Sequence, residues 1–214
     1  MTPFLVAALL ACTPGSNAAS PSSATNGAHD ETPAAVPVPT AGQAVAVLAG
    51  GCFWCLESDL DHLPGIVATT SGYIAGKADK PTYYQVGAGG TGHTEAVHVV
   101  YDTSKLTYDQ VLDFFWHHID PTDAGGQFCD RGDQYRPGIY PVDPAQLAAA
   151  EKSRAALEAS KALPAPLATE IKSGQTFWPA ETYHQDYWKK EPESYQRYRT
   201  GCGRDARVAK LWGK

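Results

Sequence analysis

The composition of the chain changes near residue 43, and this change limits which part of the chain can fold. Residues 13–43 are mostly Ala, Pro, Ser, Thr, Gly and Asn, and besides alanine their only aliphatic side chains are Val36 and Val38. Such a segment buries too little apolar surface to repay the entropy of ordering, so we expect a disordered, semi-extended tether. Residues 44–214 are long enough for one hydrophobic core, and we expect a single domain there.

The first twelve residues differ from the tether. They read MTPFLVAALLAC, an apolar run too short to span a bilayer as a mature helix but typical of an export signal. Leu9 to Cys12 resembles a bacterial lipobox, so we expect Cys12 to be lipidated and the protein to be exported, on the periplasmic side, anchored to a bacterial membrane. The first three residues carry no Lys or Arg, which leaves an uncleaved tail or a misassigned start codon as alternatives.

The charge balance excludes some classes of partner. The chain has 23 acidic and 17 basic residues, a formal net charge of −6, so we expect no nucleic-acid partner. With 43% hydrophobic and 19% charged residues, the chain is too polar for a protein with several membrane spans. Membrane contact is expected only through the N-terminal lipid, and a monomer is the default state.

Hydrophobic periodicity predicts both helices and strands in residues 44–214. Strands are expected at residues 43–49, 66–73, 94–101 and 167–172, and helices at residues 53–63, after Thr107, at 144–160 and at 183–198. Residues 120–138 are polar, Gly-rich and aperiodic, which is typical of a long functional loop. Because strands and helices do not alternate strictly, the pattern favours an α+β sandwich over a doubly wound parallel sheet.

Cys52 occupies the position most suited to chemistry. It follows the first predicted strand and Gly50-Gly51, at the start of the next helix, where unpaired N–H groups favour a thiolate. We therefore expect an exposed, reactive anion, with Phe53 and Trp54 beside it as walls of an apolar pocket. The alternative is a small buried hydrophobic side chain among core aromatics.

Cys52 and Cys55 form a C-x-x-C motif, which has two other interpretations. Structural zinc needs two more ligands, and neither Cys129, Cys202 nor the histidines supply a second close pair at zinc-knuckle spacing, so we expect no metal site. A thioredoxin-like dithiol oxidoreductase fits a strand followed by C-x-x-C at a helix start. A non-enzymatic exported module that binds metal or a partner through its cysteines is a third alternative.

Four segments in order resemble the peptide methionine sulfoxide reductase A family. They are Gly-Cys-Phe-Trp at 51–54, Gly-Gly-Thr-Gly-His-Thr-Glu-Ala-Val at 89–97, Asp-Pro-Thr at 120–122 and Asp-Arg-Gly-Asp-Gln-Tyr-Arg at 130–136. The resemblance covers residues 44–213. Cys55 directly follows Trp54, so the chain resembles the subgroup of the family that has cysteine at this position. It implies a two-layer α/β sandwich with a mixed sheet, a ferredoxin-like core and a long C-terminal tail. It also implies reduction of free and peptide-bound methionine S-sulfoxide as repair of oxidised proteins, with no bound cofactor and an external dithiol such as thioredoxin as reductant.

The resemblance also implies roles for individual residues. It assigns Cys52 as nucleophile, Glu95 as acid, Tyr83 and Tyr135 as donors to the sulfoxide oxygen, Asp130 near the same pocket, and Phe53 and Trp54 around the S-methyl group. A sulfoxide is a poor electrophile until its oxygen is protonated or strongly hydrogen-bonded, so a carboxyl kept neutral by burial plus two phenols is a suitable donor set. The alternatives are a surface carboxylate and packing tyrosines. We expect His93, His98, His117, His118 and His184 to be structural.

The reaction leaves a sulfenic acid on Cys52, which a second thiol must condense with to form a disulfide. Three thiols are candidates for this resolving role. Cys202 lies between glycines in the C-terminal tail, where family resolvers are found, Cys55 is closest in sequence, and Cys129 adjoins Asp130. We rank them Cys202, Cys55 and then Cys129.

Overall fold

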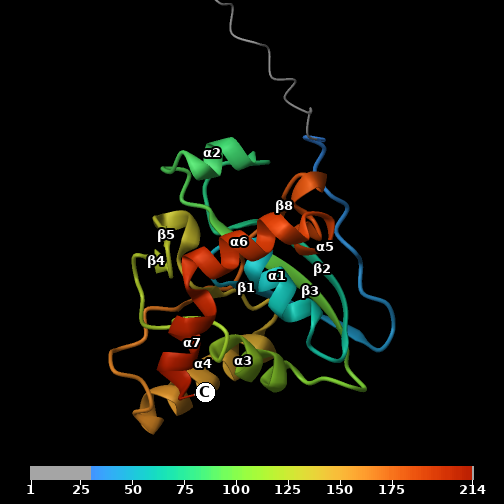
Figure 1. Cartoon of the computed structure of the whole chain (residues 1–214). Helices are drawn as coiled ribbons and strands as arrows, with labels where there is room; N and C mark the ends of the chain where they lie inside the picture. Colours follow the sequence, from blue (N-terminus) through green and yellow to red (C-terminus); the bar gives the residue numbers. More distant parts are fainter. Residues whose placement is uncertain (1–29, 214) are drawn as a thin grey trace, which may run out of the picture.

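The structure is a computed structural model that describes residues 30–213 (Figure 1). The predicted export signal with Cys12, and residues 13–29 of the predicted tether, lie outside the described residues. Within residues 30–213, no helix has both the length and the apolar character that crossing a membrane requires.

A six-stranded sheet forms the centre of the domain, in the order β7-β6-β1-β3-β2-β8. The long strands are β1 (Gln43–Ala49), β2 (Ile66–Ile74) and β3 (Thr94–Asp102), and the short ones are β6 (Gly138–Ile139), β7 (Glu170–Ile171) and β8 (Trp178–Pro179). The β6–β7 pair is parallel and every other pair is antiparallel, so the sheet is mixed. This confirms the expected α+β class with a mixed sheet.

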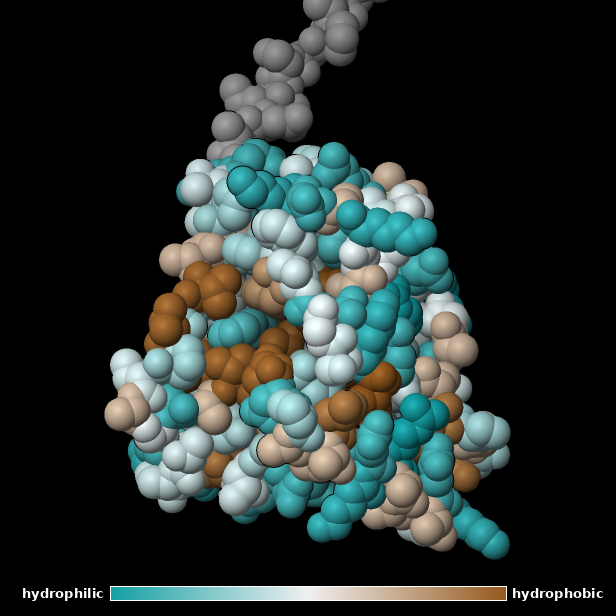
Figure 2. All heavy atoms as spheres, turned by 180° about the vertical axis from the view of Figure 1, so that it is seen from behind, coloured by the Kyte–Doolittle hydropathy of each residue, from teal (hydrophilic) through white to brown (hydrophobic). Residues whose placement is uncertain are grey.

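Three helices supply the main core together with the sheet: α1 (Phe53–Asp61), α3 (Tyr108–Trp116) and α4 (Pro144–Ser160). Because successive strand residues point to opposite faces, Leu48 joins this core while its neighbour Val47 joins a smaller cluster with Ile74 and Tyr140. Seen from behind, apolar residues gather across the middle of the molecule, with polar residues around them (Figure 2).

Side-chain caps set the helix starts that the sequence predicts. Thr107 and Gln110 form a capping box before α3, and the Asp143 side chain accepts the Gln146 N–H with Pro144 in the first turn of α4. A second capping box, made by Thr82, starts the short helix α2 (Tyr83–Gly87), which the periodicity analysis does not predict because five residues carry too little pattern.

The prediction of one helix over residues 183–198 is wrong. The segment contains a 3₁₀ turn η2 (Thr182–His184), α5 (Tyr187–Lys190) and α6 (Pro192–Cys202), followed by α7 (Arg204–Trp212). Asp186 has a left-handed φ of 53° and proline stands at the first position of α6, so the helical hydrogen bonds are interrupted twice. The C-terminal tail is therefore largely helical, and α6 lies across the molecule beside α1 (Figure 1).

Part of the predicted tether contacts the domain. The Ala34 N–H donates to the Ala180 carbonyl at 2.9 Å and the Thr182 N–H donates to the Thr32 carbonyl at 2.8 Å. Pro33 and Glu181 form an isolated antiparallel bridge between these bonds. Residues 32–34 thus lie along the segment that follows β8.

The predicted loop at residues 120–138 is folded tightly by its own polar groups. It contains the two-residue strands β4 (Gly126–Gln127) and β5 (Asp130–Arg131), which pair with each other, and a 3₁₀ turn η1 (Asp133–Tyr135). The fully buried Gln127 amide bonds the Asp120 backbone at both ends, accepting at 2.8 Å and donating at 2.7 Å. These bonds fix the loop between the sheet and the C-terminal helices.

Candidate active site

Cys52 lies at the N-terminal end of α1, as the sequence predicts, in the turn that connects β1 to the helix. Gly51 makes this turn possible, because it has φ +81° and a Cβ there would lie 2.5 Å from Cβ of Gln127. The turn thus packs the start of α1 against the folded loop that contains Gln127. This arrangement brings the loop residues to the sulfur.

The expectation that Cys52 is an exposed anion is wrong for this structure. Its side chain is 6% exposed, and burial raises the pKa of the thiol well above its usual value. The Cys52 thiol donates to the sulfur of Cys55, and this bond, with the charges of Arg204 and Arg199, lowers the pKa of Cys55. The two thiols therefore share a hydrogen bond, and the positive charge of the arginines favours a thiolate at Cys55.

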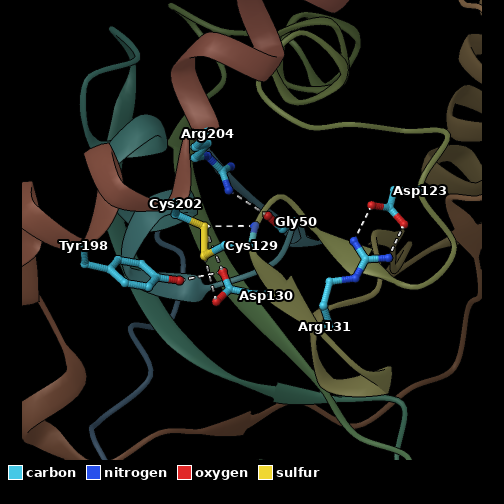
Figure 3. Close-up of a disulfide and its surroundings, with 8 residues drawn as sticks. All are labelled: Gly50, Asp123, Cys129, Asp130, Arg131, Tyr198, Cys202 and Arg204. Atoms are coloured by element: carbon cyan, nitrogen blue, oxygen red, sulfur yellow. Dashed lines mark hydrogen bonds and ion pairs between the residues drawn. A yellow bond between two sulfur atoms is a disulfide. The ribbon is translucent and has the colours of Figure 1, made fainter.

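Two arginines, Arg204 and Arg199, place positive charge beside Cys55. Arg204 is 2% exposed and donates to the Gly50 carbonyl at 2.9 Å (Figure 3). It also donates to the His118 carbonyl at 2.9 Å. Its Nε also lies 3.3 Å from Asp59 on α1, which Arg199 reaches at 2.8 Å. The two guanidinium groups are thus fixed beside the inner turn of α1.

Glu95 is positioned by β3, opposite Tyr73 of β2, and its side chain is 3% exposed. Its Oε2 accepts the Phe53 N–H at 2.9 Å, so this carboxyl contacts the first residue of α1. Burial raises the pKa of Glu95 to about 8, against the lowering effect of that hydrogen bond, and the charges of Asp130 and Cys55 raise it further. At neutral pH the group is therefore mostly protonated and can donate.

The structure brings Tyr83, Tyr135 and Asp130 to the same place from three distant segments. Tyr83 begins α2, Tyr135 ends η1, and both are half-buried. Burial raises the pKa of Tyr83 to about 12 and that of Tyr135 further, and the charges of Glu95, Asp130 and Cys52 act on both phenols. Both hydroxyls therefore keep their protons.

An aromatic cluster surrounds the start of α1. The Phe53 ring is almost fully buried, with its centroid 6.5 Å from that of Tyr83, while Trp54 is half-buried. The Trp54 ring stacks on Tyr187 with centroids 3.9 Å apart, and its N–H donates to Nδ1 of His184 at 3.1 Å. The predicted aromatic walls thus exist, and the C-terminal segment supplies further members.

The sequence analysis missed Tyr187 and Tyr198, and it treated His184 as structural only. Tyr198 of α6 donates to Asp130 at 2.5 Å, and its oxygen also lies within hydrogen-bonding contact of Cys52. The signal in the sequence is the density of aromatic residues at 183–198, which the analysis assigned to a single aromatic-rich helix without a role in the site.

The remaining cysteines are joined to each other. Cys129 and Cys202, 73 residues apart in the sequence, form a disulfide, whereas Cys52 and Cys55 are free (Figure 3). Among residues 30–213, one group, Cys129, Asp130 and Cys202, has the spacing of a metal site, but its sulfurs are bonded to each other in this state. The structure thus contains a free inner pair, Cys52 and Cys55, and a bonded outer pair, Cys129 and Cys202.

Comparisons with known proteins agree with this geometry. Residues 44–214 match the family described as peptide methionine sulfoxide reductase. MsrA 2 of Caulobacter vibrioides is 52% identical over 169 residues, covering 78% of this chain and 85% of that protein. The MsrA/MsrB protein of Vibrio cholerae is 46% identical over 184 residues, 86% of this chain, and the chain spans 49% of that protein's length.

Solved structures show the same fold. Methionine sulfoxide reductase A of Corynebacterium diphtheriae superimposes with a TM-score of 0.63 at 31% identity, covering 72% of this chain and 77% of that one. Reduced Mxr1 of Saccharomyces cerevisiae gives a TM-score of 0.68 at 31% identity, covering 73% and 90%. With its family match, relatives and fold in agreement, the chain belongs to the peptide methionine sulfoxide reductase A family and is a peptide methionine (S)-sulfoxide reductase.

Proposed function

We propose that Cys52 is the nucleophile and Glu95 the acid with which this protein reduces methionine S-sulfoxide, free or in oxidised proteins. The observation that carries the proposal is the buried Glu95 carboxyl, with a pKa raised to about 8, bonded to the residue next to Cys52. Thiol–disulfide exchange has no sulfoxide oxygen to protonate, so it does not require one acid and two phenols around the same point. Tyr83, Tyr135 and Asp130 complete the group around the reacting atoms.

The reaction transfers one oxygen atom from the substrate to the enzyme. Cys55 takes the proton that it shares with Cys52, and the Cys52 sulfur attacks the sulfoxide sulfur. Glu95 delivers a proton to the oxygen, which Tyr83 and Tyr135 polarise by hydrogen bonds, and methionine leaves as the thioether. Cys52 retains the oxygen as a sulfenic acid.

Phe53 and Trp54 are proposed to hold the S-methyl group. Phe53 is 1% exposed, and Trp54 is held by its stacking on Tyr187 and its bond to His184, so neither ring has to be ordered when substrate binds. The two rings thus provide rigid apolar walls for the methyl group, while the polar side chains of Glu95, Tyr83 and Tyr135 are proposed to bind the sulfoxide oxygen.

A thiol must then condense with the sulfenic acid. Cys202, Cys55 and Cys129 were the candidates, and the contact between Cys52 and Cys55 favours Cys55 for the first disulfide, because Cys202 is bonded to Cys129. We propose that a thioredoxin-like dithiol restores the thiols. One solved structure holds yeast Mxr1 in complex with Trx2, and it shares this fold with a TM-score of 0.51 at 22% identity.

We further propose that the protein acts outside the cytoplasm, held by a lipid on Cys12. The support is the apolar run before Leu9 to Cys12 and the polar composition that follows it. Mass spectrometry of the native N-terminus tests this: a lipid on Cys12 is expected, and an unmodified Met1 would contradict it.

The assay for the reaction uses a peptide with both epimers of methionine sulfoxide and excess dithiothreitol. The parent is expected to consume one epimer, and Glu95→Gln is expected to slow that reaction by roughly 100-fold or more because the proton donor is lost. Glu158→Gln, which changes an exposed carboxylate paired with Arg154 on α4, is the matched control. Equal rates for Glu95→Gln and the parent would refute the acid assignment.

A further inference from the structure

We propose that Glu181 is a positioning residue for the reaction, which holds the Tyr83 hydroxyl where it meets the sulfoxide oxygen. The inference rests on the proposed function, because it takes Tyr83 as a donor to that oxygen. Glu181 lies between β8 and η2, and its side chain is 3% exposed. Burial of a carboxyl group is costly unless hydrogen bonds compensate for it, so the partners of this group indicate what it holds in place.

Both oxygens of the Glu181 carboxyl group accept hydrogen bonds. Oε1 accepts the Tyr83 N–H at 2.8 Å, and Oε2 accepts the Tyr73 hydroxyl at 2.9 Å. Tyr83 is the first residue of α2, and Tyr73 is a fully buried residue of β2. One carboxyl group thus connects the start of α2 to the central sheet.

The Tyr83 N–H is a group that α2 cannot satisfy by itself. The N–H groups in the first turn of a helix have no partner within the helix, and the capping box of Thr82 and Gln85 satisfies the N–H groups of those two residues only. A helix of five residues also has little stability of its own, so contacts from outside decide where it lies. The bond to Glu181 therefore fixes the backbone from which the Tyr83 side chain extends.

The ring of Tyr83 is held by a neighbour that also lies beside Glu181. The His184 ring packs on the Tyr83 ring with centroids 4.3 Å apart, and its Nε2 lies 3.9 Å from Oε2 of Glu181. Nδ1 of His184 accepts the Trp54 N–H, so the proton of the neutral ring is on Nε2, the nitrogen nearer to Glu181. Glu181 thus favours the ring orientation that packs on Tyr83 and binds Trp54.

The backbone around Glu181 is itself fixed from two sides. The Ala180 N–H donates to the Ser71 carbonyl of β2 at 2.9 Å, and the Thr182 N–H donates to the Thr32 carbonyl at 2.8 Å. The position of residue 181 is therefore determined by the sheet and by the segment that precedes β1. A carboxyl group held in this way can hold its own partners in turn.

These contacts matter for the reaction because a donor is effective only within hydrogen-bonding distance of the oxygen as the S–O bond breaks. The Tyr83 hydroxyl stands at the far end of its side chain, so a small shift of the start of α2 moves it away from the oxygen. Glu181 bonds Tyr83 and Tyr73 rather than the reacting sulfur, and it acts through Tyr83.

Three substitutions separate the two bonds from the charge. Glu181→Leu removes both bonds, and Glu181→Asp keeps the charge but is one methylene too short to reach both partners. Glu181→Gln keeps the length, because its oxygen can accept the Tyr83 N–H while its amide donates to the Tyr73 oxygen. With methionine S-sulfoxide and excess dithiothreitol, the Leu and Asp variants should lower kcat/KM by roughly tenfold or more, and the Gln variant by less than about threefold.

Combination with Tyr83→Phe tests whether Glu181 acts through Tyr83. Once the hydroxyl is absent, the Leu or Asp substitution should lower kcat/KM by less than about a further twofold. A general structural role would instead give losses that multiply in the double variant, and that result would overturn the proposal. A Gln variant as slow as the Leu variant would also overturn it, since the charge and not the bonds would then be responsible.

Tyr73→Phe is the matched control, because it removes the other bond of the same carboxyl group and leaves the bond to the Tyr83 N–H. It should lower the free energy of unfolding in urea while kcat/KM changes by less than about threefold. A loss of kcat/KM as large as that of Glu181→Leu would contradict the route through Tyr83.

Failure of this inference differs from failure of the proposed function. If the parent consumes neither epimer of methionine sulfoxide, the proposed function is rejected. If the parent is active and Tyr83→Phe is equally active, Tyr83 is not a donor and the role of Glu181 is rejected with it. The Asp and Gln variants keep a polar side chain at residue 181, so their comparison decides the question even where the Leu variant does not fold.

Discussion

The inner and outer cysteine pairs reach the same site by different means. Cys52 and Cys55 are one helical turn apart, buried and free, so any fold with a helix over these residues brings them together. Cys129 and Cys202 are separated by 73 residues and are joined only because α6 packs against the loop that contains Asp130. The inner pair is thus a property of local structure, and the outer pair is a property of tertiary packing.

The charges differ as well. The inner pair has two arginines beside it and a neutral carboxylic acid, Glu95, at the helix start, whereas the outer pair has a carboxyl in contact with both sulfurs. Chemistry on the substrate needs the first environment, because it combines a thiolate with a proton donor. Exchange with another protein needs exposure, which only Cys129 has among these four residues.

The largest expected effect is the loss of the first turnover when the nucleophile of the inner pair is replaced. Cys52→Ser should abolish the first turnover, by a factor of roughly 10,000 or more, because a hydroxyl does not attack the sulfoxide sulfur. Cys129→Ser should still form one methionine per chain in rapid-quench measurements without reductant. A Cys52→Ser protein that still forms methionine would reverse the assignment of the two pairs.

The outer pair should contribute more to the free energy of unfolding than the inner pair does. Its disulfide closes a loop of 73 residues, and the entropy removed from the unfolded chain corresponds to about 4 kcal/mol. Urea unfolding of the oxidised and the fully reduced protein should show this difference. This expectation is wrong if reduction leaves the free energy of unfolding unchanged. It is also wrong if Cys55→Ser lowers the free energy of unfolding of the oxidised protein as much as reduction does.

The pH dependence reports on the inner site. The active form has lost one proton from the inner pair and keeps one on Glu95, whose pKa is raised to about 8, so the first-turnover rate should fall tenfold per pH unit above about pH 8. Stopped-flow measurements from pH 6 to 10 would check this. If the residual activity of Glu95→Gln declines in the same way, another group is responsible.

The same carboxyl also makes the stability of the folded protein fall as pH rises. Between its ordinary pKa of 4.5 and about 8, the folded protein keeps a proton that the unfolded chain releases, so the contribution of Glu95 to stability falls as pH rises through that window. Glu95→Gln should therefore be more stable than the parent at pH 8, by up to about 4 kcal/mol in urea unfolding. Equal stability at pH 8 would mean that Glu95 is ionised there at no cost.

The smallest effect is expected at Tyr198, which lies between the two pairs. Tyr198→Phe removes the bond to Asp130 at 2.5 Å and should cost about 1 kcal/mol in stability. It also removes the contact of the phenol with Cys52. The first turnover should still change by less than about threefold, because Cys52 keeps its contact with Cys55 and Glu95 keeps its bond to the Phe53 N–H. A much larger loss of rate would place Tyr198 among the proton donors and require a revised assignment of Tyr83 or Tyr135.

Local signals were sufficient for much of the fold. The apolar run of β1, the alternation of β3, the capping box at Thr107 and the Asp143-Pro144 start of α4 all depend on neighbours in the sequence, and the structure has these elements. The same reasoning failed at residues 183–198. Pro192 is a local break that the assignment of one helix ignored, whereas the left-handed backbone at Asp186 accompanies a tertiary contact, the bond from its N–H to Glu57 of α1.

The amino-acid sequence alone determined that Cys52 begins a helix after a strand, that Cys55 lies one turn further on, and that Glu95 lies on a strand, since each follows from interactions over a few residues. Only the tertiary structure decided that Cys52 is buried, that Glu95 retains its proton, and that Cys129 meets Cys202. The physical reason is that exposure and pKa depend on desolvation and on charges from distant segments, which have no signature in local spacing.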